Sequence, residues 1–181
     1  MELFEAIKTR RSIRRYKPDP VDDDALQMVL EAARWAPSWA NTQCCRFIVV
    51  GDSTLKARLA ATLNEGNPAT AAIENAPVVI IACAELGVSG YYHETPATDK
   101  GDWYMFDVAL AMQNLALAAH AIGLGTVHVG LFNAREVAKI LDVPEGLSVV
   151  EMTPLGHPER EGRVTPRKEL SEIVYYDKYS H

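Results

Sequence analysis

Apolar residues recur along the chain at spacings that predict helices and strands in alternation. Leu3, Phe4 and Ile7 fall on one face of a short helix, and Leu55, Leu59 and Leu63 repeat at spacing four. The same reasoning predicts helices over residues 2–8, 22–35, 54–63, 103–122 and 133–141. Strands are predicted over residues 46–50, 77–84, 126–131 and 147–155.

Two of these segments suggest where the core lies. Residues 77–84 are almost wholly apolar and rich in valine and isoleucine, as in a strand covered on both faces. Residues 103–122 are apolar nearly all round, which predicts a central buried helix that Gly123 and Gly125 end. Residues 87–101 form a long polar and aromatic loop of a length that is often functional. The tail 172–176 is β-prone and could pair with a sheet edge.

These elements predict one layered domain over residues 1–181, with helices packed on a sheet. The length suits a single hydrophobic core, and no internal repeat or interdomain linker is visible. A central helix that is apolar all round needs more cover than a chain this short readily gives. Burial against a second copy of the chain would supply that cover.

Composition and charge exclude several classes of protein. The chain is 48% hydrophobic and 23% charged, which argues against disorder. Its net charge of −6 argues against a general nucleic-acid binder. No apolar run is long enough to span a membrane, and no secretory signal is visible. Cys44, Cys45 and Cys83 form no disulfide or zinc pattern, so we expect a reducing cytoplasm and no metal site.

Arginines cluster near the N-terminus of this acidic chain. In an extended segment, Arg10, Ser12 and Arg14 would point to one side, and Arg11 and Arg15 to the other. Guanidinium groups with a hydroxyl on one face suit the binding of a phosphate. The same cluster could instead be a solvated edge that pairs with the aspartates that follow it.

Three further segments carry polar or glycine-rich patterns, and each also has a purely structural interpretation. Residues 36–43 could read the edge of a planar heterocycle, or could simply be a turn that ends a helix. The glycines of residues 123–130 allow close approach to a ligand, and they also end a helix. Residues 166–168 form a second basic group, which is weak by itself.

The order of these motifs resembles that of the nitroreductase family in its short-chain form, and the resemblance covers nearly the whole chain. Each motif is weak, but their ordered conjunction is fairly specific. The motifs are Arg10-x-Ser12-x-Arg14, Pro37-Ser38-x-x-Asn41-x-Gln43, Gly123-Leu124-Gly125-Thr126, and Leu155-Gly156-x-Pro158 before Pro166-Arg167-Lys168. Many relatives have Pro-Trp where this chain has Cys44-Cys45. We expect these two thiols to be buried and structural rather than redox-active.

The resemblance implies an α+β fold with a central mixed β-sheet flanked by helices, in an intertwined homodimer that binds two FMN molecules at the subunit interface. It implies that the flavin phosphate, ribityl chain and pyrimidine edge face Arg10, Arg11, Ser12 and Arg14. The other subunit would contribute Pro37, Ser38, Trp39 and Asn41. The backbone amides of Val129 and Gly130 would lie near flavin N5 and O4, and the phosphate would also contact Arg167 and Lys168.

The resemblance further implies an oxidoreductase that passes a hydride from NAD(P)H to flavin N5. A nitroaromatic, a quinone or a similar planar acceptor would then take the electrons in the same cleft, by a ping-pong mechanism. We assign no catalytic acid, base or nucleophile to a side chain, because the flavin carries the chemistry. Two alternatives stay open: a flavin-binding carrier or sensor without turnover, and a family member with specialised chemistry. His120 is expected to be a hydrogen-bonded core histidine.

Overall fold

A four-stranded antiparallel sheet forms the centre of the molecule in the computed structural model, which describes residues 1–179. The strands are β1 (Cys45–Val50), β2 (Val78–Glu85), β5 (Gly125–Thr126) and β6 (Leu147–Gly156). They lie in the order β1-β2-β6-β5. β2 therefore has a neighbour on each side, and residues 79–84 are fully buried, which confirms the strand predicted to be covered on both faces.

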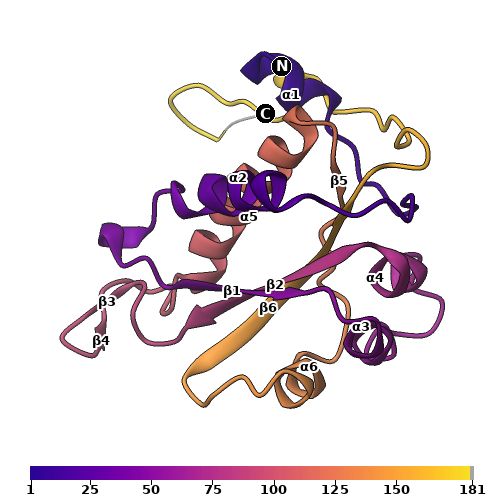
Figure 1. Ribbon diagram of the computed structural model, residues 1–181. Coiled ribbons are helices and arrows are strands. Elements are labelled where there is room, and N and C mark those ends of the chain that lie inside the picture. The colour runs from indigo at the N-terminus through magenta and orange to yellow at the C-terminus, as the bar shows by residue number, and fades with distance from the viewer. Residues whose placement is uncertain (180–181) are drawn as a thin grey trace.

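Helices cover both faces of this sheet (Figure 1). One layer contains α2 (Asp23–Arg34) and α5 (Tyr104–Ala121), which pack on the sheet in one apolar cluster. The other layer belongs to a second cluster and contains α3 (Ser53–Ala60), α4 (Thr70–Asn75) and α6 (Ala134–Ile140). The N-terminal helix α1 (Leu3–Thr9) lies beside one end of α5. The α+β fold is confirmed.

Local capping explains why several helices begin where they do. The carboxylate of Asp22 accepts a hydrogen bond from the Ala25 amide at 2.8 Å, which fixes the start of α2 as the sequence predicts. Asn133 caps α6 in the same way, since its side-chain oxygen accepts from the Glu136 amide at 3.1 Å. Polar residues placed directly before an apolar repeat therefore set both boundaries.

The central helix α5 is buried on the side that faces the sheet and open on the other. Met112 and Leu115 are fully buried, whereas Met105 is 56% exposed and Phe106 is 52% exposed. One chain therefore leaves part of this apolar helix uncovered, as its composition predicts.

The structure corrects several expectations. The parallel part of the predicted mixed sheet is limited to an isolated bridge between Ser12 and Thr126. The strand predicted over residues 126–131 is wrong in extent, because β5 ends at Thr126 and only Val129 pairs again, with Met152. The helix α4 was not predicted. The loop over residues 87–101 contains a small hairpin, with strands β3 (Tyr91–Tyr92) and β4 (Thr95–Pro96).

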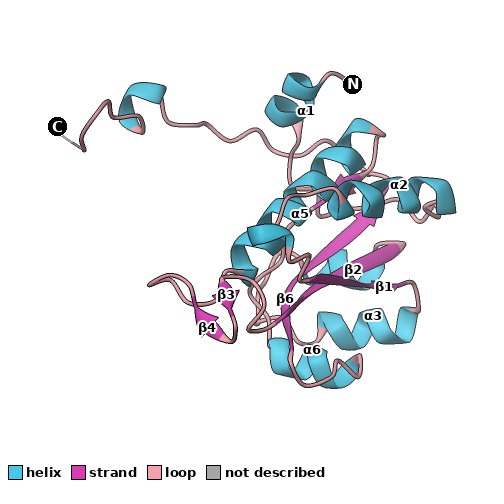
Figure 2. Cartoon of the chain, turned by 90° about the vertical axis from the view of Figure 1, so that its left-hand side faces the viewer, coloured by secondary structure: helices cyan, strands magenta, loops and turns pink. Residues whose placement is uncertain are grey.

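The tail prediction is also wrong within the described residues. Residues 172–176 form no strand and pair with no sheet edge of this chain, and the short helix η2 (Leu170–Glu172) ends where the strand was expected to begin. A reciprocal capping box between Glu169 and Glu172 stabilises this helical turn locally. Figure 2 shows the C-terminal segment running away from the body of the molecule.

Segments from the two ends of the chain pair with each other. Tyr16 and Pro158 form an antiparallel bridge. Beside it, the Lys17 amide donates to the His157 carbonyl at 2.9 Å, and the Glu159 amide donates to the Arg15 carbonyl at 3.0 Å. Basic residues distant in sequence are thereby brought to one region.

Candidate functional site

The arginine-rich segment is held against the edge of the sheet. Ser12 bridges Thr126 in parallel, and the Ile13 amide donates to the Thr126 carbonyl at 2.9 Å. The Ile13 side chain is buried against Gly125, where an added Cβ would lie 2.7 Å from Ile13 Cγ1. Only glycine allows this approach, so the Gly-Leu-Gly motif has a packing role beside the segment that carries Arg14.

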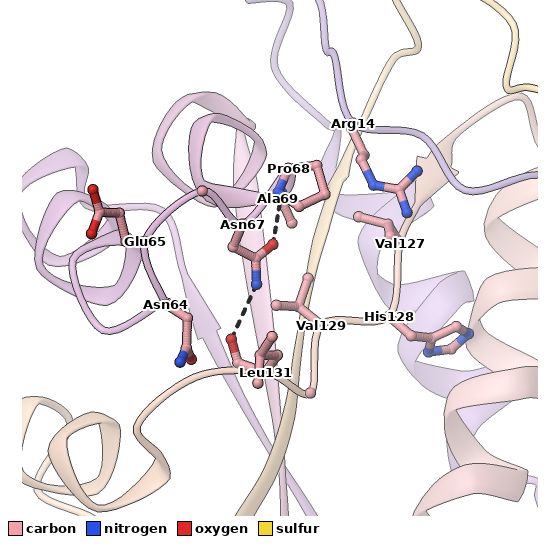
Figure 3. Close-up of a pocket in the computed structure, with 12 residues that line it drawn as sticks. Arg14, Asn64, Glu65, Asn67, Pro68, Ala69, Val127, His128, Val129 and Leu131 are labelled. Carbon is pink, nitrogen blue, oxygen red and sulfur yellow. Dashed lines mark hydrogen bonds between the residues drawn. The ribbon is translucent and has the colours of Figure 1, made fainter.

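Arg14 and the segment that follows β5 line a common cavity of about 350 Å³. Figure 3 shows Arg14 on one rim of this cavity, with Val129 and the loop of residues 64–69 across from it. Gly130 also lines the cavity. The family resemblance implies that Arg14, Val129 and Gly130 face one ligand, and these three residues line the same cavity.

One backbone assignment needs correction. The amide of Val129 donates to the Met152 carbonyl at 3.0 Å, so it is not available to a ligand. The Gly130 amide has no hydrogen-bond acceptor among residues 1–179 and lies at an exposed position on the cavity. The isolated β-bridge of Val129 thus leaves Gly130 as the one amide of this pair that is free to donate.

Sequence reasoning missed the loop over residues 64–69, which forms the other wall of the cavity. Asn67 Nδ2 donates to the Leu131 carbonyl at 3.1 Å, and Asn67 Oδ1 accepts from the Ala69 amide at 2.9 Å (Figure 3). A single amide side chain therefore joins the two walls. The polar run Asn-Glu-Gly-Asn-Pro was a visible loop signal, but its long-range partner was not readable from the sequence.

Unbalanced positive charge surrounds Arg10. Arg10 Nη1 and Arg11 Nε are buried, and within the described part of the chain neither has a hydrogen-bond partner. Burial lowers the pKa of Arg10, and the nearby charges of Arg11 and Arg167 lower it further. Arg167, which is distant in sequence, therefore lies within electrostatic reach of Arg10. Such a group of cations is suited to an anionic ligand.

The other basic residues that were predicted to contact the phosphate are either engaged by other groups of the chain or exposed to solvent. Arg11 Nη1 donates to the Lys8 carbonyl at 2.7 Å and to the Arg10 carbonyl at 2.8 Å, so this group is largely engaged by the backbone. Lys168 is exposed on the C-terminal segment. Arg167 itself donates to Thr165 Oγ1 at 2.8 Å.

Asp107 organises the loop that follows α2. This carboxylate is 1% exposed and accepts a hydrogen bond from the Trp39 amide at 2.9 Å. The Cys44 thiol donates to the same carboxylate at 3.4 Å. Within the loop, Ser38 Oγ accepts from the Gln43 amide at 2.9 Å. A buried acid on the central helix therefore fixes residues 38–44.

The same chain does not bring this loop to the Arg14 cavity. Pro37 and Ser38 line a separate cavity of about 470 Å³, next to Cys45. Trp39 packs against Tyr92, with ring centroids 4.9 Å apart, and Asn41 is exposed at a positive φ of 57°. In Figure 1 the loop after α2 lies at the opposite end of the molecule from β5. These four residues can meet Arg14 only if they come from another copy of the chain.

The three thiols differ in their surroundings. Cys44 and Cys83 are buried, and burial raises the pKa of Cys83 to about 11. The neighbouring Cys45 thiol and burial raise the pKa of Cys44, whereas the neighbouring Cys44 thiol lowers the pKa of Cys45, whose burial opposes the decrease. The expectation of buried thiols is confirmed for Cys44, whereas Cys45 is half-buried on a cavity.

The two histidines near the site have defined partners. His120 Nε2 lies 2.8 Å from Thr9 Oγ1, which confirms a hydrogen-bonded histidine, although its ring is only half-buried. Burial and the charges of Arg10 and Arg11 lower the pKa of His120. His128 Nδ1 lies 2.8 Å from Glu151 Oε1, and in Figure 3 its ring points away from Asn67 and Val129.

Two absences hold for residues 1–179. None of the helices there has the length and apolar character needed to cross a bilayer. Nor does that region contain a group of three or more His, Cys, Asp or Glu side chains placed to hold a metal ion.

Comparisons with known proteins identify the family to which the chain is similar. A family model described as Nitroreductase family matches residues 7–157. A protein of Methanothermobacter thermautotrophicus, provisionally named NADH dehydrogenase/NAD(P)H nitroreductase, is 33% identical over 162 residues, which cover 87% of this chain and 78% of that protein.

Two solved structures have the same fold. The crystal structure of a nitroreductase family protein from Clostridium novyi NT is 34% identical, with a TM-score of 0.78 over 99% of this chain and 95% of that one. A protein of Desulfovibrio desulfuricans, solved in complex with FMN, is 32% identical, with a TM-score of 0.78 over 99% of each chain.

Proposed function

Since the chain belongs to the nitroreductase family, we propose that it is an FMN-dependent oxidoreductase that takes electrons from NAD(P)H. A nitroaromatic, a quinone or a similar planar compound is the acceptor. The FMN complex of the Desulfovibrio desulfuricans protein supports the cofactor, and the name of the Methanothermobacter relative supports the donor. The free thiols of this chain support a reducing cytoplasm as its compartment.

The strongest support from this chain's own residues is the buried, unpartnered nitrogen of Arg10 beside Arg167. The phosphate of FMN carries nearly two negative charges, and it would provide the acceptor that Arg10 Nη1 lacks among residues 1–179. Ser12, Arg11 and Lys168 are the remaining candidates for this end of the cofactor. The residues present therefore fit the phosphate of the group that the family implies.

The cavity that Arg14 and Gly130 line fits the ring end of the same cofactor. Arg14 can place positive charge near N1 and O2, where negative charge develops on reduction. The free Gly130 amide can donate at the N5 and O4 edge, a role that the engaged Val129 amide cannot share. When bound, FMN would supply the redox chemistry by accepting a hydride and passing electrons to the acceptor. One shared cleft for donor and acceptor gives ping-pong kinetics.

A homodimer completes this site. Pro37, Ser38, Trp39 and Asn41 would reach the flavin from the partner subunit. Exposed apolar side chains support this association, because Leu3 and Phe4 on α1 are 62% and 74% exposed in one chain. The uncovered side of α5 and the C-terminal segment that runs away from the body (Figure 2) are the other surfaces available for it.

The test is the colour of the purified protein. FMN added to the protein and passed through a desalting column should co-elute with it, and NADH or NADPH added without oxygen should bleach the yellow flavin. A quinone added next should restore the colour. A protein that retains FMN and is bleached by neither donor would be a carrier or sensor instead. A protein that retains no FMN would contradict the proposal altogether.

A further inference from the structure

Arginine side chains surround a second cavity next to the proposed flavin site. This cavity, of about 400 Å³, is called the arginine cavity below. Its charged and hydroxyl side chains are Ser12, Arg14, Arg15, Arg160, Glu161 and Arg163. One carboxylate thus faces four guanidinium groups, in a chain whose net charge is −6. Positive charge is concentrated here against the overall balance of the protein.

Nothing else in the described chain neutralises these arginines. Within residues 1–179, the guanidinium groups of Arg14, Arg15, Arg160 and Arg163 form no ion pair and no hydrogen bond. Other exposed cations of the molecule do pair, such as Arg46 with Glu85 at 2.9 Å. The four unpaired groups therefore repel one another, and an anion bound between them would relieve the repulsion.

The backbone holds these like charges close together. The Glu159 amide donates to the Arg15 carbonyl at 3.0 Å, which joins the segment with Arg160 to the segment with Arg15. Gly162 lies so close to the Cβ of Arg11 that no side chain would fit at that position. The two backbone segments that carry these arginines are therefore hydrogen-bonded to each other.

The arginine cavity adjoins the proposed flavin cavity, because Arg14 lines both. The flavin phosphate is already assigned to Arg10 and Arg167, which leaves Arg15, Arg160 and Arg163 for a second anionic group. The electron donor must bind against the flavin, and NADPH differs from NADH only by a phosphate on the 2′-hydroxyl of its adenosine ribose. Planar guanidinium forks bind such a phosphate well.

We propose, on the basis of the proposed function, that Arg15, Arg160 and Arg163 bind the 2′-phosphate of NADPH and make it the preferred donor. These residues are specificity-determining and take no part in the redox step. NADH, which lacks this phosphate, gains little from the three cations.

The variant to test is R160Q/R163Q, because neither residue is assigned to the flavin. The expected result is a fall of about tenfold or more in kcat/KM for NADPH, with kcat/KM for NADH within about twofold of the parent. FMN content should not change. The control R58Q/R135Q removes the same charge from α3 and α6 in the other helix layer, and it should keep the parent's ratio of NADPH to NADH.

A binding measurement on the parent holoenzyme gives a second test. Adenosine 2′,5′-bisphosphate should bind about tenfold more tightly than adenosine 5′-phosphate, and R160Q/R163Q should lose the difference. This comparison needs no turnover, and equal binding of the two nucleotides to the parent would count against the proposal.

Three results for R160Q/R163Q would overturn the assignment. An equal loss for both donors would mean that the arginines bind the pyrophosphate, which NADH and NADPH share. A loss of FMN would mean that they bind the flavin phosphate. An unchanged preference would mean that they bind neither. A parent protein that retains no FMN, or that neither donor bleaches, would instead contradict the proposed function itself.

Discussion

Arg10→Met separates the energy of cofactor binding from the energy of folding. Methionine keeps an unbranched side chain of similar length and removes the guanidinium. In the structure that guanidinium is half-buried, its Nη1 has no partner within residues 1–179, and burial and two neighbouring cations lower its pKa. The charge of Arg10 therefore opposes folding in the absence of an anion and favours the binding of one.

The two expected effects have opposite signs. A hydrogen bond to a charged group contributes about 1.5–3 kcal/mol, so the loss of the phosphate contact should raise the Kd for FMN about 10- to 150-fold. Replacing an unpaired, partly buried charge by an apolar group of similar shape is neutral or stabilising. The free energy of unfolding of the FMN-free protein should therefore stay the same or rise by about 1 kcal/mol.

Both quantities can be measured on the same preparation. FMN binding is followed by the change in flavin fluorescence on titration, and stability by urea unfolding of the FMN-free protein. The control is Arg135→Met on α6, which should change the Kd by less than about twofold. A Kd for FMN in Arg10→Met within about threefold of the parent would refute the phosphate assignment. A loss of more than about 1 kcal/mol of stability would show that Arg10 supports the fold instead.

Three further predictions concern the framework of the site. Asp107→Ala leaves the Trp39 amide without its acceptor and should lower the free energy of unfolding by about 2–3 kcal/mol in urea, whereas a loss below about 0.5 kcal/mol would contradict the role of this carboxylate. Gly125→Ala places a Cβ 2.7 Å from Ile13 and should cost about 1–3 kcal/mol in the same assay; an unchanged midpoint would show that Ile13 moves aside freely. Cys83, with its pKa raised to about 11, should resist iodoacetamide in the folded protein at pH 7.5 and react after unfolding, as seen by mass spectrometry; its alkylation in the folded protein at the rate of a free thiol would contradict its burial.

Elements with a strong local signal could be predicted from the sequence. The caps at Asp22 and Asn133 and the apolar run of β2 each contain their own structural cause, and the structure confirms them. Elements that depend on a distant partner could not. The strand expected over residues 126–131 is shorter because its pairing with β6 is interrupted after Thr126 and resumes only at Val129 with Met152. In the gap, the Thr153 hydroxyl rather than a backbone amide donates to the Val127 carbonyl, at 2.9 Å. The tail forms a capped helical turn because Glu169 and Glu172 satisfy each other locally.

The same distinction, between features with a local signal and features that depend on a distant partner, holds for the functional site. Arg14 and Gly130 were assigned to one ligand through the family resemblance, and they line one cavity. Asn67 was missed because its role depends on the Leu131 carbonyl, which is distant in sequence. The engagement of the Val129 amide was missed for the same reason, since the acceptor lies on β6. Residue types at short spacing indicate the chemistry, but the hydrogen bonds that use up a donor come from the tertiary fold.

The pairing of residues 15–17 with residues 157–159 also bears on when the arginine cavity can form during synthesis. The Lys17 amide donates to the His157 carbonyl at 2.9 Å, and Tyr16 and Pro158 form an antiparallel bridge, so segments separated by most of the chain are joined. Closing so long a loop contributes late in folding, after the local helices and hairpins have formed. On the ribosome, the residues around Arg14 and Arg160 stay apart until nearly the whole chain has emerged. The arginine cavity is therefore complete only in a chain that has been synthesised past Arg163.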